Sequence, residues 1–270
     1  MKLIGSWLKR VKVLVLFVVA GFAFFLLPGS AQTQGQHDPR IGEPEAEFQI
    51  ARIIYATNRR AGSHGWIQPM WAVDYPLADA HFLETLRRYT KIQVAEDSRH
   101  LELTDERLFK FPFLWLQQPA AGQWNPSKDD AAALHEYLMR GGFMMVDDFH
   151  GDNEWDYFAD VMNWILPDFQ IVTIPPEDPV MHTFFDIDQT TKIPGDRHLR
   201  RGANGETVVT SGTPHFRGIY DGTGRLMVIA NHNMDIGDSW EHADTPEYPL
   251  ALTAAGYQLG VNYVLYAMTH

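Results

Sequence analysis

Two adjacent carboxylates and a nearby imidazole follow a short apolar run in the segment GGFMMVDDFHGD, residues 141–152. The acids are Asp147 and Asp148, and the imidazole belongs to His150. An acid and an imidazole this close in sequence can exchange a proton with a substrate or hold a divalent metal ion. Asp148 and His150 are therefore the candidate catalytic residues, and a divalent metal is the candidate cofactor.

The position of these residues depends on the run Phe143–Val146, which is too short and continuous for a helix and predicts a buried strand of a parallel sheet. Ligands of such sheets bind beyond the carboxyl ends of the strands. Because neighbouring strand residues point to opposite faces, at most one of Asp147 and Asp148 can project into a crevice. We expect the other to cap the next helix or to pair with a buried donor. Solvated or capping carboxylates are an equally good interpretation of the pair.

A second polar group, NHNMDIGDSWEH (Asn231–His242), directly follows an apolar run that ends at Ala230. Asn231, Asn233 and Asp235 have the spacing of the first, third and fifth ligands of a calcium-binding loop. The sixth position is isoleucine instead of glycine and the twelfth is histidine instead of glutamate, so the match fails. An Asx-rich turn, whose side chains bind their own backbone, is the better interpretation.

A third group, WAVDYPLAD (Trp71–Asp79), lies in the loop after the first predicted strand. It adds Asp74 to the candidate ligand-binding residues. Trp71 and Tyr75 could present a flat surface to a sugar, although aromatic residues in such loops more often cover the core.

Other chemistries are weakly indicated or excluded. His215 and Arg217 could contact an anion or form a surface ion pair. The sequence contains no G-x-S-x-G elbow, no P-loop, no dinucleotide-binding fingerprint and no H-E-x-x-H motif. It also contains no cysteine, which excludes disulfides, thiolate metal sites and a cysteine nucleophile.

Alternating strands and helices must bring these groups together. Strands are predicted at residues 50–56, 91–95, 111–116, 143–146, 170–175 and 225–230, and helices at 78–90, 127–140, 155–166 and 250–268. The helix after Ser127 has the clearest signals, because Ser127 and Asp130 form a capping box and Gly141 can end it. The alternation predicts an α/β fold, doubly wound around a mostly parallel sheet, formed by residues 48–270 as one domain.

The N-terminus has the pattern of an export signal. A basic start precedes residues 13–27, which carry no charge, and small residues lead to Ala31. Residues 1–31 are therefore predicted to be a signal peptide, and residues 32–47 a linker. An uncleaved membrane anchor is the alternative, although the uncharged run is shorter than the roughly 20 residues that span a bilayer. We expect a periplasmic or secreted domain, in contact with a membrane only if the N-terminal segment stays uncleaved.

Net charge limits the partners. Removing residues 1–31 takes away four basic residues and no acidic one, which changes the formal charge from −12 to −16. Nucleic acid is excluded as a partner, because phosphate binding needs a basic face.

Five segments together resemble a known family: WAVDYPLAD, GGFMMVDD, DPVMHTFF, GRLMVIANHNMDIGDSWE and LGVNYVLYAMT. They are similar to a bacterial family of domains of unknown function, family 4159, which looks related to the class I glutamine amidotransferase-like superfamily, as do the trehalose-utilisation-like proteins. The resemblance covers about residues 48–269 and implies a flavodoxin-like sheet. Active amidotransferases use a cysteine on a strand-to-helix elbow. The segment Asp147–His150 is the nearest counterpart of that elbow here. It has no cysteine, so glutamine hydrolysis by that route is excluded.

Two functions remain open. The first is an exported domain that binds a small polar ligand or a cell-envelope partner at the strand ends. The second is a metal- or carboxylate-assisted hydrolase acting on a carbohydrate or related envelope substrate. Both use the same crevice, with a floor of Asp147, Asp148 and His150 and a rim of Asp74, Asn231, Asp235 and Trp240. A metal enzyme is favoured if Asp148, His150 and a group from Asn231–His242 surround one point at ligand distance.

Overall fold

The strand predicted to carry the two acids lies in the middle of the sheet. The computed structural model describes residues 42–57, 60–63, 66–204 and 206–270. In it β6 (Phe143–Phe149) is buried along its whole length. It pairs in parallel with β5 (Phe113–Gln117) on one side and with β11 (Leu226–His232) on the other. The carboxyl ends of these three strands therefore meet at one edge of the sheet.

Seven strands form the central sheet, in the order β4-β1-β5-β6-β11-β10-β7. The remaining four are β1 (Ala51–Ile53), β4 (Arg99–Leu101), β7 (Ile171–Thr173) and β10 (His215–Tyr220). The first five strands in this order are parallel, whereas β10 runs antiparallel to β11 and β7 antiparallel to β10. The predicted α/β class with a mostly parallel sheet is confirmed.

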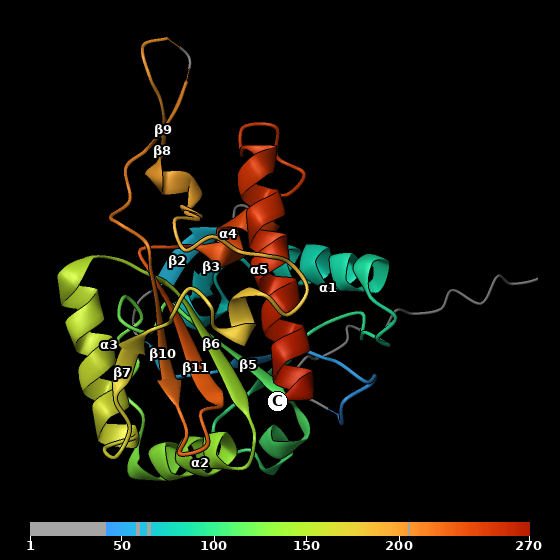
Figure 1. Cartoon of the computed structure of the whole chain (residues 1–270), viewed down its shortest axis with the longest axis vertical. Coiled ribbons are helices and arrows are strands. Elements are labelled where there is room, and N and C mark those ends of the chain that lie inside the picture. The colour runs from blue at the N-terminus through green and yellow to red at the C-terminus, as the bar shows by residue number, and fades with distance from the viewer. Residues whose placement is uncertain (1–41, 58–59, 64–65, 205) are drawn as a thin grey trace, which may run out of the picture. The chain divides into compact units, whose positions relative to one another are not determined.

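Helices cover both faces of the sheet (Figure 1). One face packs against α1 (Leu77–Tyr89), α4 (Ile236–Glu241) and α5 (Leu250–Thr269), and the other against α2 (Lys128–Met139) and α3 (Gly151–Ile165).

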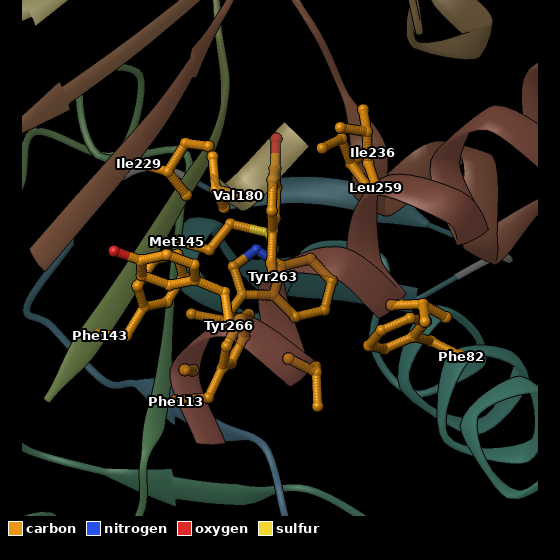
Figure 2. Close-up of a cluster of buried hydrophobic side chains, with 14 of the residues drawn as sticks. Phe82, Phe113, Phe143, Met145, Val180, Ile229, Ile236, Leu259, Tyr263 and Tyr266 are labelled. Atoms are coloured by element: carbon orange, nitrogen blue, oxygen red, sulfur yellow. The ribbon is translucent and has the colours of Figure 1, made fainter. Parts of the chain in front are cut away.

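The alternation of β6 divides the core in the same way. Phe143 and Met145 contact the α5 face, where Figure 2 shows them beside Tyr263 and Tyr266. The intervening Met144 and Val146 belong to the cluster under α2 and α3.

Helix α2 begins and ends at the residues that the sequence signals predicted. The hydroxyl of Ser127 accepts a hydrogen bond from the Asp130 backbone N–H at 3.1 Å, and the Asp130 carboxylate accepts one from the Ser127 N–H at 2.9 Å. Gly141 follows α2 with a φ of 108°. In α5, a Cβ on Gly256 would lie 1.9 Å from Ser239 Oγ, so only glycine permits this close packing against α4.

Three parts of the sheet region differ from the prediction. Residues 91–95 form only an isolated bridge between Val94 and Phe48, and the edge strand is β4 instead. Strand β4 contains Arg99 and His100, so it lacks the apolar run that marks a buried strand. Strand β10 and helix α4 were not predicted, because the first carries mixed polarity and the second has only six residues.

The remaining elements are short. They are β2 (Arg60–Ser63) paired with β3 (Trp66–Pro69), β8 (Leu199–Arg201) paired with β9 (Thr207–Val209), and the 3₁₀ turns η1 (Met70–Ala72), η2 (Glu106–Lys110), η3 (Pro179–Met181) and η4 (Asp196–His198).

The predicted signal peptide, residues 1–31, and residues 32–41 of the predicted linker lie outside the described residues. The described residues belong to one compact unit within Asp38–His270. In this part of the chain, none of the helices has the length and apolar character needed to cross a bilayer.

Candidate functional site: an aspartate cluster at the strand ends

Asp147 caps a helix, but not the one that follows it in sequence. Continuing the alternation of β6, its side chain lies on the α4 face of the sheet, where Asp147 Oδ2 accepts hydrogen bonds from Ile236 N at 2.7 Å and Gly237 N at 2.9 Å. These N–H groups belong to the first turn of α4 and have no partner within the helix. Asp147 Oδ1 is buried and has no hydrogen-bond partner among the described residues. One carboxylate of the pair is therefore largely used as a cap.

Asp148 leaves the strand direction with a φ of 53° and is 2% exposed. Asp148 Oδ1 lies 3.0 Å from His150 Nε2 and accepts a hydrogen bond from an Arg197 guanidinium nitrogen at 2.5 Å. Asp148 Oδ2 accepts a hydrogen bond from the side-chain amide of Gln118, which directly follows β5. The second carboxylate is thus held by donors from three parts of the chain.

Further buried aspartates complete the site, which we name the aspartate cluster: Asp74, Asp147, Asp148, Asp235 and Asp238. Asp235 lies at the N-terminus of α4 and accepts a hydrogen bond from Asp238 N at 3.0 Å. Asp74, in the loop before α1, accepts one from Gln117 Nε2 at 2.6 Å.

Three groups in and beside the cluster have the geometry of a metal site. Within each group the potential ligand atoms all lie within 4.8 Å of one another, and the groups are Asp148–His150–Asp235, Asp74–Asp235–Asp238 and Asp196–Asp238–His242. Oxygen and nitrogen ligands lie about 2.0–2.6 Å from divalent ions, so atoms this close can share one ion. The first group unites the predicted Asp148 and His150 with a residue of the second polar segment.

Burial dominates the electrostatics of the cluster. It raises the pKa of Asp147 to about 7 and, together with the charge of Asp148, the pKa of Asp238 to about 8. Burial and neighbouring carboxylates hold the pKa values of Asp74 and Asp235 well above the usual range.

Asp148 is different. Burial acts to raise its pKa, but the hydrogen bond with His150 and the charge of Arg197 outweigh burial and lower the pKa. The rest of the cluster therefore needs protons or a cation to neutralise it at pH 7.

The segment Ile193–His198 covers the cluster. Ile193 O accepts a hydrogen bond from Asp235 N at 2.8 Å, and Arg197 from the same segment reaches Asp148. The His198 ring lies 4.4 Å from that of His150, and burial and the nearby positive groups lower the pKa of His198 to about 4. His198 is therefore a neutral imidazole at pH 7.

A pocket of about 280 Å³ adjoins this cover. Asp196 and His242 line it, and both belong to the third potential metal group. Arg200, Arg201 and Tyr248 also line the pocket and give it a partly basic wall.

The other predicted site residues have structural partners. Asn231 Oδ1 accepts a hydrogen bond from the Tyr263 hydroxyl at 3.0 Å, so Asn231 lies on the α5 side of β11. Trp240 is completely buried and stacks on Phe82 with ring centroids 3.9 Å apart. Trp240 therefore belongs to the core instead of the rim of a crevice.

The remaining loop residues are also held by the fold. Asn233 accepts a hydrogen bond from Gly151 N at 2.8 Å, and its side-chain amide donates to a backbone carbonyl. Trp71 and Tyr75 pack edge-on against His100, at centroid distances of 5.2 and 4.5 Å. Of the three residues with calcium-loop spacing, only Asp235 joins the cluster.

Sequence reasoning missed several members of the site. Gln117 and Gln118 directly follow the strand predicted at residues 111–116, and this position at a strand end could have identified them. Asp238 lies inside the polar segment already noted. Arg197 lies in an irregular stretch with no recurring pattern, so only the tertiary structure brings it to Asp148.

One family profile matches nearly the whole described domain. The sequence profile of a family described as a domain of unknown function, DUF4159, matches residues 49–268. The chain belongs to the DUF4159 family. All five residues of the aspartate cluster lie within the matched region. None of the curated proteins matches the chain.

Proposed function

We propose that this DUF4159 domain binds a divalent metal ion through Asp148, His150 and Asp235. The observation that carries the proposal is the convergence of these three side chains from the end of β6 and the start of α4. Residues this far apart in sequence meet only at the carboxyl edge of the sheet, where α/β folds bind ligands. The proposal takes up the divalent metal that the sequence analysis named as the candidate cofactor.

The ligand types indicate which ion binds. Two carboxylates and one imidazole, without thiolate, suit Mn²⁺ and Mg²⁺, with Zn²⁺ as a competitor through His150. Without a bound ion, the Arg197 guanidinium balances the charge of Asp148 through an ion pair. The Arg197 side chain is 52% exposed. Arg197 can therefore swing into solvent when an ion takes over its charge.

Hydrolysis is the second candidate function, and the pocket of about 280 Å³ beside Asp196 and His242 favours it. Asp148 and Asp235 would hold the ion in this function, and a bound divalent ion would supply an activated water as the nucleophile. In this function His150, 16% exposed through its side chain, would accept the proton instead of binding the ion, because a metal-bound imidazole has no free lone pair for a proton. Arg200 and Arg201 line the pocket together with Asp196 and Glu247, and this mixed polar wall suits a carbohydrate or related envelope substrate.

The proposal includes a flavodoxin-like sheet related to the class I glutamine amidotransferase-like superfamily. Its support is the positive φ of Asp148 at the junction of β6 and α3, because nucleophile elbows place a strained residue at such a turn. An aspartate there cannot take over the cysteine chemistry. Export through residues 1–31 also stays part of the proposal, supported by the basic and apolar pattern of that segment.

The test uses the full-length chain, stripped of metal with a chelator and then titrated with Mn²⁺. At one hundred times the dissociation constant, binding stabilises the folded state by about 2.7 kcal/mol and raises Tm by roughly 5–10 °C. The Asp148→Asn variant loses this shift, since the amide brings no negative charge to the ion.

The matched control is Asp152→Asn, which removes an exposed carboxylate two residues from His150 and keeps the full shift. An equal Tm shift in the parent and in Asp148→Asn, or no shift in either, rules out this site. For the hydrolase, Mn²⁺-dependent release of product from carbohydrate esters or glycosides must disappear in Asp148→Asn.

A further inference from the structure

We infer that a second divalent cation binds beside the first, held by Asp74, Asp235 and Asp238, with the Asp235 carboxylate bridging the two ions. This inference rests on the proposed function of the cluster as a metal site. It adds a two-ion centre, which is a different chemical unit from a single bound metal.

Asp235 is the geometric reason. It belongs to the Asp148–His150–Asp235 group and also to the Asp74–Asp235–Asp238 group, with ligand atoms within 4.8 Å of one another in each. A carboxylate has two oxygens and can coordinate one ion through each of them. Such sharing places two ions about 3.5–4 Å apart in two-metal sites.

An independent observation comes from Asp74. This residue is 1% exposed, and its Oδ1 has no hydrogen-bond partner among the described residues, while Oδ2 accepts from Gln117. A buried oxygen without a partner is costly, and proteins usually provide a donor, a water or an ion for it. Asp74 supplies one carboxylate oxygen to the group with Asp235 and Asp238, so an ion held by the three residues neutralises the carboxylate to which this oxygen belongs.

The charges around this group point the same way. Among the ion pairs of the described residues, Asp74 and Asp235 have none, and the only partner of Asp238 is His242 at 3.8 Å. The nearby Arg52 is engaged with Asp79 at 2.6 Å, and Arg197 with Asp148. The three carboxylates thus gather without a guanidinium or ammonium group of their own.

Two glycines allow the backbone to lie directly against the three carboxylates. A Cβ on Gly195 would lie 2.5 Å from Asp235 Oδ2 and 2.8 Å from Asp238 Oδ2. A Cβ on Gly237 would lie 2.2 Å from Asp74 Oδ2. Glycine at these two positions lets the covering segment and α4 enclose the carboxylates without displacing them.

The ligand set identifies the class of ion. Three carboxylates and no imidazole favour a hard, oxygen-preferring cation, Mg²⁺ or Mn²⁺, over Zn²⁺ or Cu²⁺. Since Mn²⁺ also suits the neighbouring group with His150, it fills both positions and serves as the probe.

The experiment counts Mn²⁺ ions and reports whether they are coupled. The metal-free full-length chain is titrated with Mn²⁺, the bound metal is measured after desalting, and the electron paramagnetic resonance spectrum is recorded. We expect two equivalents in the parent, with the spectrum of a magnetically coupled pair. Asp74→Asn should bind one equivalent and show the six-line spectrum of an isolated Mn²⁺, whereas Asp152→Asn should keep two coupled ions.

The possible outcomes separate the two proposals. One equivalent in the parent, lost in Asp148→Asn and unchanged in Asp74→Asn, overturns the second ion and leaves the first intact. No bound ion in the parent overturns both proposals. Two coupled ions in Asp74→Asn overturn the assignment of the second position. Asparagine matches aspartate in size, and if Asp74→Asn fails to fold by circular dichroism, Asp238→Asn tests the same position with the same expected loss of one ion.

Discussion

Two groups of buried charge lie on the same side of the sheet and are balanced in opposite ways. Arg52 and Asp79 are both fully buried and form a forked ion pair, with nitrogen–oxygen distances of 2.6 to 3.0 Å. The Arg52 guanidinium also lies 3.7 Å from the centre of the Trp115 ring. The aspartate cluster, by contrast, gathers five carboxylates and has one arginine, Arg197, at its edge.

The difference shows how a structural charge pair can be distinguished from a binding site. Arg52 and Asp79 satisfy each other, and two backbone carbonyls accept further hydrogen bonds from the guanidinium. Nothing needs to be added to that pair. The cluster leaves Asp74 Oδ1 without a hydrogen-bond partner among the described residues, and a cation bound by Asp74 would compensate for this.

The largest expected effect is a pH dependence of the metal-free protein. Raised pKa values mean that the folded state holds protons that the unfolded state releases above about pH 4. The stability from Asp147 and Asp238 is therefore present at low pH and is lost as pH rises through about 7 and 8. At about 1.4 kcal/mol per pH unit for each carboxyl group, we expect a decrease of roughly 6 kcal/mol between pH 5 and pH 8.

Urea denaturation at several pH values in chelator checks this decrease, and saturating Mn²⁺ should reduce it because the ion replaces the proton of its ligand Asp238. Asp148 contributes with the opposite sign, since its lowered pKa makes its stabilisation disappear only at acidic pH. A metal-free profile that rises from pH 5 to pH 8 would contradict the proposed charge balance.

The next effect comes from breaking the self-sufficient pair. Asp79→Asn leaves the Arg52 guanidinium buried without its counter-charge, and we expect a loss of about 3–5 kcal/mol in the free energy of unfolding. Urea denaturation with chelator and with Mn²⁺ measures it. The loss should be the same in both conditions, and a loss that Mn²⁺ restores would contradict a purely structural role.

A smaller, stabilising effect is expected from Asp74→Asn in the absence of metal. The amide replaces a carboxyl group whose charged form is opposed by burial and by the neighbouring carboxylates, and it keeps the shape of the side chain. We expect a gain of about 1–2 kcal/mol in the free energy of unfolding at pH 8, measured in chelator. The gain should shrink at pH 5, and a loss at both pH values would show that Asp74 acts through its hydrogen bond to Gln117.

The smallest effect belongs to Asp152→Asn, which removes an exposed charge beside the cluster. Exposed substitutions of this kind change the free energy of unfolding by less than about 0.5 kcal/mol, as the same denaturation curves can show. A larger change would mean that long-range charge, and not the buried carboxylates, controls the stability of this edge of the sheet.

Much of the fold follows from local patterns. Strand β6 was predicted from its continuous apolar run, and α2 from the Ser127 and Asp130 capping box. Strand β4 was missed because Arg99 and His100 are buried through tertiary contacts, such as the ion pair between Arg99 and Glu45 at 2.5 Å. A pattern of side-chain polarity cannot anticipate burial that is compensated by a distant partner.

The candidate site divides in the same way. Asp148, His150 and Asp235 could be proposed because they lie in the polar segments that follow two predicted strands, and the ends of parallel strands meet at one edge. The cap formed by Asp147 on α4, the approach of Arg197 and the core position of Trp240 could not, since each depends on how distant segments pack.

The sequence by itself determined the α/β class, the central strand and the position of the acids at its end, because hydrophobic periodicity and helix capping act over a few residues. Only the tertiary structure decided which carboxylates share a space and which are used as caps. The physical reason is that a charge inside a protein is governed by burial and by neighbours within a few ångströms, and those neighbours come from segments far apart in the chain.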